Sequence, residues 1–121
     1  MSVHWKDLKV WQRSHQLVLD IYRITAKFPK SETYGLVDQL KRAAYSIPAN
    51  IVEGQSRNTT KEYIRFLHNA RGSLEEVRYF LLLSSELQFL SSEGYEYLEN
   101  EYKTMSKMLN ALIKSLKTRS A

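Results

Sequence analysis

The sequence predicts an all-α protein that folds as an antiparallel, up-and-down four-helix bundle. Apolar residues recur at steps of three and four along four long stretches, and this spacing puts them on one face of a helix. The 121 residues include only four glycines and two prolines, so the chain has few places to turn. No stretch alternates apolar and polar residues as a half-buried strand would. The composition, 43% hydrophobic and 26% charged, is that of a globular chain, and we expect one domain over residues 1–121.

The first helix is predicted from about Lys6 to Phe28. Two neighbouring apolar stripes run along it, which together make the wide apolar face of a bundle helix. Pro29 ends this helix, because the residue before a proline is pushed out of helical dihedral angles. One of the two stripes comprises Leu8, Trp11, His15, Val18, Tyr22 and Thr25.

The second helix is predicted from about Tyr34 to Ser56, with Ser31 or Thr33 as its N-cap. Pro48 falls inside the apolar pattern of this segment. A proline there removes one backbone donor and clashes with the preceding turn, so we expect a kink. Two shorter helices are the alternative, but the apolar periodicity continues beyond the proline and favours one kinked helix.

The third helix is predicted from about Lys61 to Gln88, with Thr59 or Thr60 as its cap. Gly72 lies in the middle of this segment, where glycine disfavours a helix by roughly 1 kcal/mol. We therefore expect a neighbouring helix to approach the chain closely at that glycine.

The fourth helix is predicted from about Ser92 to Lys117, with Ser91 as its cap. Its glutamates lie early and its lysines late, which complements the helix macrodipole. That order gives the basic tail a structural explanation. Because the connections between the four helices are short, neighbouring helices should be antiparallel.

The residue types needed for most catalytic sites are missing. There is no cysteine, which excludes disulfides, thiolate nucleophiles and zinc knuckles. None of the three histidines, His4, His15 and His68, is three or four residues from another, and no Glu-x-x-His occurs. No phosphate-binding glycine loop or nucleophile elbow is present. We therefore expect a protein that is not an enzyme and holds no metal and no cofactor.

The first residues contain no apolar segment typical of a signal peptide. The longest apolar run, Tyr79 to Leu83, is far too short to cross a bilayer. The sequence thus predicts a cytoplasmic protein without a membrane partner.

The net charge of +5 and a pI of about 9.5 favour an acidic partner such as RNA or DNA. A solvated surface with surplus lysine would explain the same charge. Basic residues gather around the second connection, and side chains grouped in this way bind phosphates with little sequence preference. A solvated face is again the alternative, and we favour phosphate binding. The candidate nucleic-acid contacts are Arg42, Arg57, Lys61, Arg65 and Arg71.

A polar stripe runs along the second predicted helix, where Ser46, Asn50 and Glu53 recur at steps of four and three. It is either a solvated face or a buried, hydrogen-bonded network. In the second case Glu53 needs a cationic partner, because unpaired burial of a carboxylate costs several kcal/mol. Arg57 at the next turn, or Arg71 across the bundle, could supply it.

Three runs of sequence carry a resemblance to a known family: WKDLKVWQ at residues 5–12, RAAYSIPANIVEG at 42–54 and GSLEE at 72–76. They resemble the bacterial four-helix bundle proteins encoded in intervening sequences of large-subunit ribosomal RNA genes, which are often labelled ribosomal protein-like. The resemblance implies a four-helix bundle assembled as a cyclic homopentamer. It also implies similarity to the accessory protein of diversity-generating retroelements, which binds nucleic acid and a reverse transcriptase.

Most of the motif positions of that family are interpreted as packing and polar-network residues rather than catalytic ones. The expected function is that of a non-enzymatic, oligomeric accessory protein that binds RNA or DNA through a basic surface. The alternative is a structural module that binds a protein partner such as a polymerase. The motif positions map to Arg42, Ser46, Asn50, Glu53, Gly54, Arg57, Ser73 and Glu76.

Overall fold

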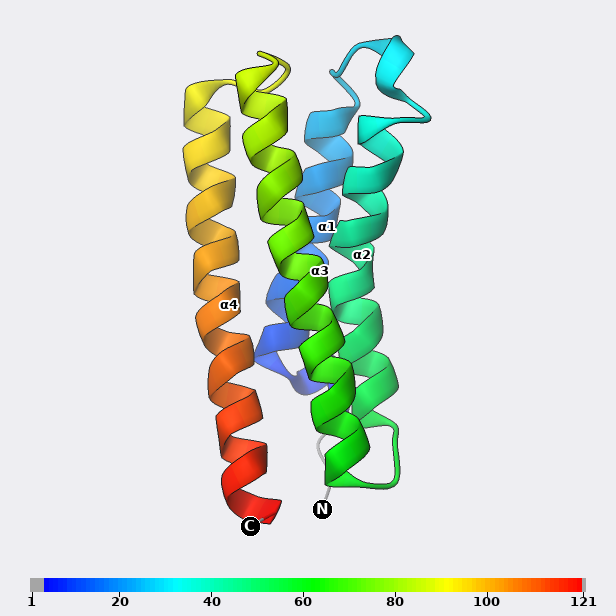
Figure 1. Ribbon diagram of the computed structural model, residues 1–121, viewed down its shortest axis with the longest axis vertical. Helices are drawn as coiled ribbons and strands as arrows, with labels where there is room; N and C mark the ends of the chain where they lie inside the picture. Colours follow the sequence, from blue (N-terminus) through cyan, green and yellow to red (C-terminus); the bar gives the residue numbers. More distant parts are fainter. Residues whose placement is uncertain (1–3, 121) are drawn as a thin grey trace.

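A computed structural model describes residues 4–120 and shows an all-helical bundle. Helices α1 (Lys9–Thr25), α2 (Leu36–Gln55), α3 (Thr60–Glu86) and α4 (Ser92–Ser120) lie side by side with alternating direction (Figure 1). No strand occurs among the described residues. The predicted fold class is therefore confirmed.

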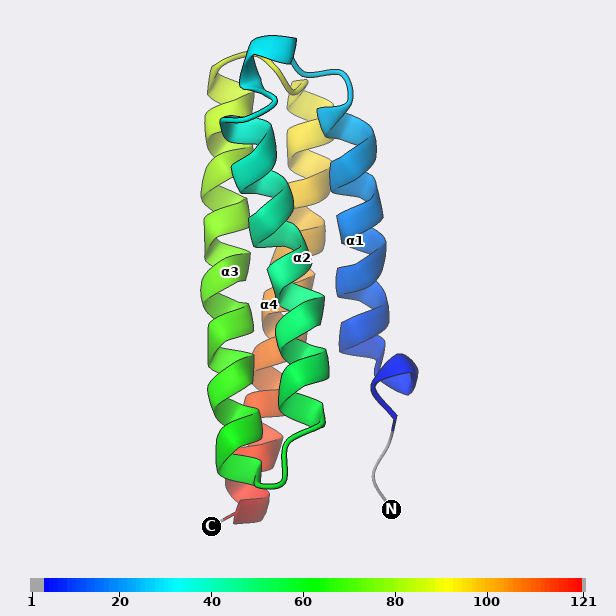
Figure 2. The same ribbon diagram turned by 90° about the vertical axis from the view of Figure 1, so that its right-hand side faces the viewer.

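The ends of the first helix differ from the expectation. A short 3-10 helix, η1 (Trp5–Asp7), precedes α1, and Leu8 between them has extended dihedral angles. Figure 2 shows η1 beside the start of α1, at the end of the bundle that also holds the α2–α3 connection. Helix α1 then ends at Thr25, a full turn before Pro29.

The prediction that Ser31 or Thr33 caps α2 is wrong. Both lie in or next to a second 3-10 helix, η2 (Lys30–Glu32), and α2 begins only at Leu36. A carboxylate oxygen of Glu32 accepts a hydrogen bond from the Leu36 backbone N–H at 3.3 Å instead. Helix α2 continues through Pro48 as one helix. The kink expected at Pro48 stays a prediction.

Two other predicted caps are confirmed. The Thr59 hydroxyl accepts a hydrogen bond from the Glu62 N–H at 3.2 Å at the start of α3. The Ser91 hydroxyl accepts one from the Gly94 N–H at 3.0 Å at the start of α4. In each case a side chain satisfies a backbone donor that the first helical turn leaves without a partner.

The prediction of a close helix approach at Gly72 is wrong. Gly72 is exposed to solvent, and a Cβ atom there would meet nothing within 4 Å. The close approach occurs at Gly54 in the last turn of α2. A Cβ atom at Gly54 would lie 2.8 Å from the Cβ of Phe66 and 3.0 Å from the Cδ1 of Tyr63. Only a glycine lets α2 and the first turns of α3 come this close.

The core runs the whole length of the bundle, because each helix contributes a stripe of buried side chains. Tyr102 is fully buried among them, and its hydroxyl has no hydrogen-bond partner among the described residues. Burial raises the pKa of this phenol well above its usual range. The largest fully buried side chains include Leu17, Ile21, Leu40, Ile47, Leu67, Leu74, Tyr102 and Leu109.

Candidate nucleic-acid interface

Three of the five predicted phosphate contacts gather where α2 passes into α3. Arg57 lies in the connection, and Lys61 and Arg65 lie one turn apart at the start of α3. All three side chains are exposed. We call these three residues the α2–α3 corner, and the connection that carries it lies at the lower end of the bundle in Figure 2.

Both arginines of the α2–α3 corner lie against one aromatic ring. The guanidinium carbon of Arg57 lies 4.7 Å from the ring centre of Phe66, and that of Arg65 lies 4.6 Å from it. Cation–π contacts of this kind restrain an exposed arginine without neutralising its charge. Phe66 was not among the residues that the sequence analysis singled out, so this role was missed. An aromatic residue next to Arg65 was the available signal.

Carboxylates occupy only part of the corner. Arg57 forms an ion pair with Glu53 at 3.0 Å, which is one of the two pairings the sequence suggested for Glu53. The two side chains are 41% and 57% exposed, so the pair contributes at most about 1 kcal/mol. No described carboxylate lies within ion-pair distance of Lys61 or Arg65. The corner therefore keeps uncompensated positive charge.

Arg71 lies almost two turns beyond Arg65 on α3 and faces α4. It donates to the amide oxygen of Asn110 at 3.0 Å and to Nδ1 of His68 at 2.9 Å. Burial, followed by the nearby charges of Arg71 and Lys117, lowers the pKa of His68. His68 is thus neutral at pH 7, and both partners of Arg71 leave its charge uncompensated.

Arg42 lies apart from the α2–α3 corner, so the five predicted contacts are not all brought together. It lies in the first half of α2, about 20 Å from Arg57 along the helix axis at 1.5 Å per residue. Its Nε donates to a carboxylate oxygen of Asp38 at 3.1 Å. Spacing along the sequence grouped Arg42 with the others, but the length of α2 separates them.

Helix α4 contributes basic residues that the sequence analysis assigned to the macrodipole alone. The antiparallel arrangement puts the last turns of α4 beside the first turns of α3 (Figure 1). The charge of Arg119 acts on Tyr63, and that of Lys117 acts on His68, across this boundary. Neither contact has a local signal in the sequence, because each depends on how the two helices pair.

The α3–α4 pair is therefore divided by charge along its length. Its basic half, residues 61–74 and 103–119, holds eight lysines and arginines and one acid, Glu62. Its acidic half, residues 75–86 and 92–101, holds seven glutamates and one arginine, Arg78. The cations of the basic half are Lys61, Arg65, Arg71, Lys103, Lys107, Lys114, Lys117 and Arg119.

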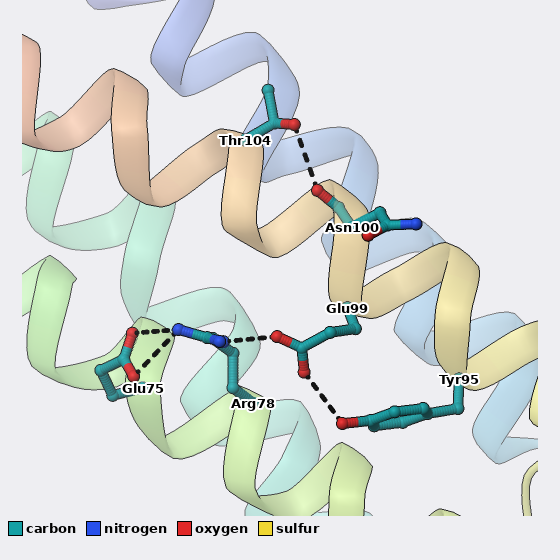
Figure 3. Close-up of polar contacts among 6 residues, drawn as sticks. All are labelled: Glu75, Arg78, Tyr95, Glu99, Asn100 and Thr104. Atoms are coloured by element: carbon teal, nitrogen blue, oxygen red, sulfur yellow. Dashed lines mark hydrogen bonds and ion pairs between the residues drawn. The ribbon is translucent and has the colours of Figure 1, made fainter.

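The single arginine of the acidic half is neutralised by its neighbours (Figure 3). Arg78 donates to Glu99 at 2.7 Å across the α3–α4 boundary and to Glu75 at 3.1 Å on its own helix. The Tyr95 hydroxyl donates to the second oxygen of Glu99 at 3.1 Å. This cluster ties α3 to α4 and leaves no free cation for a ligand.

The predicted polar network is only partly brought together. The hydroxyls of Ser46 and Ser73 lie 2.9 Å apart, and the Asn50 amide donates to the Ser46 carbonyl at 2.8 Å. These half-buried residues link the middle of α2 to the middle of α3. Glu53 lies outside the network, exposed beside Arg57, and Glu76 is exposed with no hydrogen bond or ion pair to a described residue.

The remaining features of the described residues concern metal ligands, surface hollows and helix hydrophobicity. No group of three or more histidine, aspartate or glutamate side chains within residues 4–120 is placed to hold a metal ion. Hollows lie along the boundary between α1 and α4, where an Arg13–Glu101 ion pair of 3.2 Å crosses. None of the helices in this range is long and apolar enough to cross a membrane.

The fold and the surface define a class: an all-helical bundle with one strongly basic end. The model of the 23S rRNA-intervening sequence protein family matches residues 6–111, and the chain belongs to that family. The resemblance carried by the three sequence runs is thereby confirmed.

One solved structure supports the same assignment. It is a protein of unknown function from the S23 ribosomal protein family of Bacteroides thetaiotaomicron. The two chains are 25% identical and superpose with a TM-score of 0.78 over 87% of this chain and 98% of that one. A comparison with curated proteins returned no match. Neither the family description nor that structure's description names a catalytic activity.

Proposed function

We propose that this chain is a non-enzymatic accessory protein that binds the phosphate backbone of RNA or DNA. The contact surface is the basic half of the α3–α4 pair together with the adjoining α2–α3 corner. The observation that carries the proposal is the ratio of eight lysines and arginines to one acid in that half. Such a surface releases counterions from a nucleic acid on binding, which is the main source of sequence-independent affinity.

The contacts are expected to be with phosphates rather than with base edges. Lysine and arginine side chains spread over the end of two helices meet a backbone, whereas base recognition needs an element that enters a groove. The acidic half of the same helix pair repels phosphates, so a bound strand is confined to one end of the bundle. A short footprint on each subunit follows from this arrangement.

The proposal includes self-assembly and a cytoplasmic location. The resemblance implies a ring of five subunits, in which one patch meets a different patch on the next subunit. Exposed aromatic side chains such as Tyr34 (95% exposed), Tyr79 (58%) and Tyr97 (56%) are available for such contacts. A ring would repeat the basic half on every subunit and make binding multivalent. Light scattering coupled to size exclusion measures the subunit number.

The direct test is fluorescence anisotropy with a labelled single-stranded RNA at low salt. Replacing Arg57, Lys61 and Arg65 together by alanine should weaken binding by at least about tenfold, because each removed phosphate contact lowers the electrostatic affinity. The matched control replaces Lys27, Lys30 and Arg42, which removes the same charge elsewhere on the bundle. Absent binding by the unmodified protein, or an equal loss in the control, would overturn the proposal.

A protein-binding role is the second candidate, favoured by the acidic half. Tyr79 and Leu82 are exposed there, at 58% and 40%, next to glutamates. A module of this kind would hold a protein partner such as a polymerase. A complex with a purified polymerase that survives nuclease treatment, and that is lost when Tyr79 and Leu82 are replaced by serine, would support it over nucleic-acid binding.

A further inference from the structure

The α2–α3 corner contains a feature that charge alone does not explain. Two guanidinium groups from different segments, Arg57 of the connection and Arg65 of α3, rest on one ring, that of Phe66. Like charges on an exposed surface repel and would move apart if both side chains were free. Phe66 restrains both groups near the same ring, which fits a site prepared for an anion.

We propose that Arg57 and Arg65 form a preformed binding site for one phosphodiester group, and that Phe66 is its positioning residue. This inference rests on the proposed function, because the phosphodiester would come from the bound nucleic acid. A planar guanidinium donates two parallel hydrogen bonds to phosphate oxygens, which an ammonium group cannot do. Contact with the Phe66 ring restricts the rotamers of both arginines, so less side-chain entropy is lost when the phosphate binds.

Gly54 makes this arrangement possible. A Cβ atom there would lie 2.8 Å from the Cβ of Phe66 and 3.2 Å from the backbone oxygen of Tyr63. The first of these distances is shorter than real Cβ contacts, so either Phe66 or the helix would have to shift. Gly54, the last residue of the IVEG run at 51–54, is thus explained by the space that Phe66 needs beside α2.

Glu53 competes with the phosphate for the same site. Its carboxylate lies 3.0 Å from Arg57, and the pair is exposed to solvent. A phosphodiester must displace this carboxylate from Arg57, whereas Arg65 has no described carboxylate partner to give up. Arg65 is therefore the first contact and Arg57 the second.

The test uses two substitutions that leave the net charge unchanged. Phe66→Leu removes the ring but keeps an apolar side chain, and Arg65→Lys keeps the charge but loses the planar donor pair. Each should weaken the binding of a labelled single-stranded RNA by roughly three- to tenfold, the range of a cation–π contact. The slope of log affinity against log salt should stay the same, since no charge is lost.

Phe80→Leu is the matched control, because Phe80 is also a half-buried phenylalanine of α3 that packs against the core, but in the acidic half. It should bind RNA as the unmodified protein does. Circular dichroism melting checks that Phe66→Leu is folded, and Arg65→Lys provides a surface substitution that leaves folding intact.

The outcomes separate the two proposals. Unchanged affinity in both Phe66→Leu and Arg65→Lys, with binding lost in the triple alanine variant, would overturn the preformed site and leave the basic surface standing. Absent binding by the unmodified protein would overturn both. Equal weakening in Phe66→Leu and Phe80→Leu would also overturn the positioning role of Phe66.

Discussion

In the acidic half of the α3–α4 pair, Arg78 is enclosed by the carboxylates of Glu75 and Glu99, whereas in the basic half Arg71 is held by an amide and a neutral imidazole. Both arginines lie on the same side of α3 and both cross to α4. Their partners differ: Arg78 has its charge neutralised, and Arg71 keeps its charge. Residue type therefore does not decide whether an arginine stabilises the fold or is available to a ligand.

The same contrast holds for the two ends of α4. Its early glutamates and late lysines each complement the helix macrodipole, and that effect is worth only about 0.3–1 kcal/mol at an exposed position. The larger consequence arises from pairing with α3, whose own charges change sign at the same level. The charge order along each helix has a local explanation, and the pairing of α3 with α4 turns it into one cationic and one anionic half.

The largest expected effect comes from reversing charge in the basic half. Lys114→Glu combined with Arg119→Glu should weaken RNA binding more than about tenfold at low salt, because two attractive contacts become repulsive. Anisotropy titration measures the loss. The same reversal at Lys27 and Lys30 is the control, and an equal effect there would mean that net charge, not its placement, governs binding.

Removing Arg78 should destabilise the fold but leave RNA binding unchanged. Arg78→Ala leaves the carboxylate of Glu99, whose side chain is only 14% exposed, without its cation. We expect a loss of roughly 1–3 kcal/mol in the free energy of unfolding, measured by urea denaturation. Arg71→Ala should cost less, because it leaves only neutral partners. A larger loss for Arg71→Ala would contradict the contrast between the halves.

Acidic pH should strengthen RNA binding through His68. The pKa of His68 is lowered by burial and by two cations, so the imidazole gains its proton only below its ordinary value near 6.5. The added charge lies beside Arg71 and favours phosphate, which predicts that RNA binding strengthens as the pH falls below 6.5. His68→Gln should flatten this dependence, and an unchanged profile in that variant would exclude His68 as its source.

The lowered pKa of His68 also predicts how the stability of the fold depends on pH. The folded state binds this proton less readily than the unfolded chain does. The contribution of His68 to the free energy of unfolding is therefore present above pH 6.5 and is lost as the pH falls through the lowered pKa of the folded state. RNA binding and fold stability should therefore respond to acid in opposite directions.

The smallest expected effect is at Glu53. Glu53→Gln removes the carboxylate that competes for Arg57, and RNA affinity should rise about two- to threefold, in line with the small energy of an exposed pair. Glu76→Gln removes an equal charge from an exposed glutamate that has no described partner, and it should have less effect. Equal gains in both variants would show that Glu53 acts only through net charge.

The helices and their order were predictable because apolar spacing records which face of each helix is buried. Loop details were not. The Glu32 carboxylate accepts the hydrogen bond from the first turn of α2 for which Ser31 or Thr33 was expected. Its longer side chain reaches forward from the connection to the Leu36 N–H. Gly72 and Gly54 both lie within helices, but the spacing of apolar residues does not show which of them a neighbouring helix approaches closely.

The candidate site was predictable in part, for a similar reason. Local spacing identified Lys61 and Arg65 correctly as neighbours at the start of α3. It also grouped Arg42 with them, although the length of α2 separates Arg42 from the rest. The contribution of α4 depends on contacts between residues far apart in sequence, such as Arg71 with Asn110, which no local pattern records.

The most direct measurement compares binding to two strands of the same base sequence, one RNA and one peptide nucleic acid with an uncharged backbone. If the basic half contacts phosphates, the protein binds the RNA with an affinity that falls steeply as salt increases, and it does not bind the uncharged strand. Equal binding to both strands, or RNA binding that is insensitive to salt, would contradict the account.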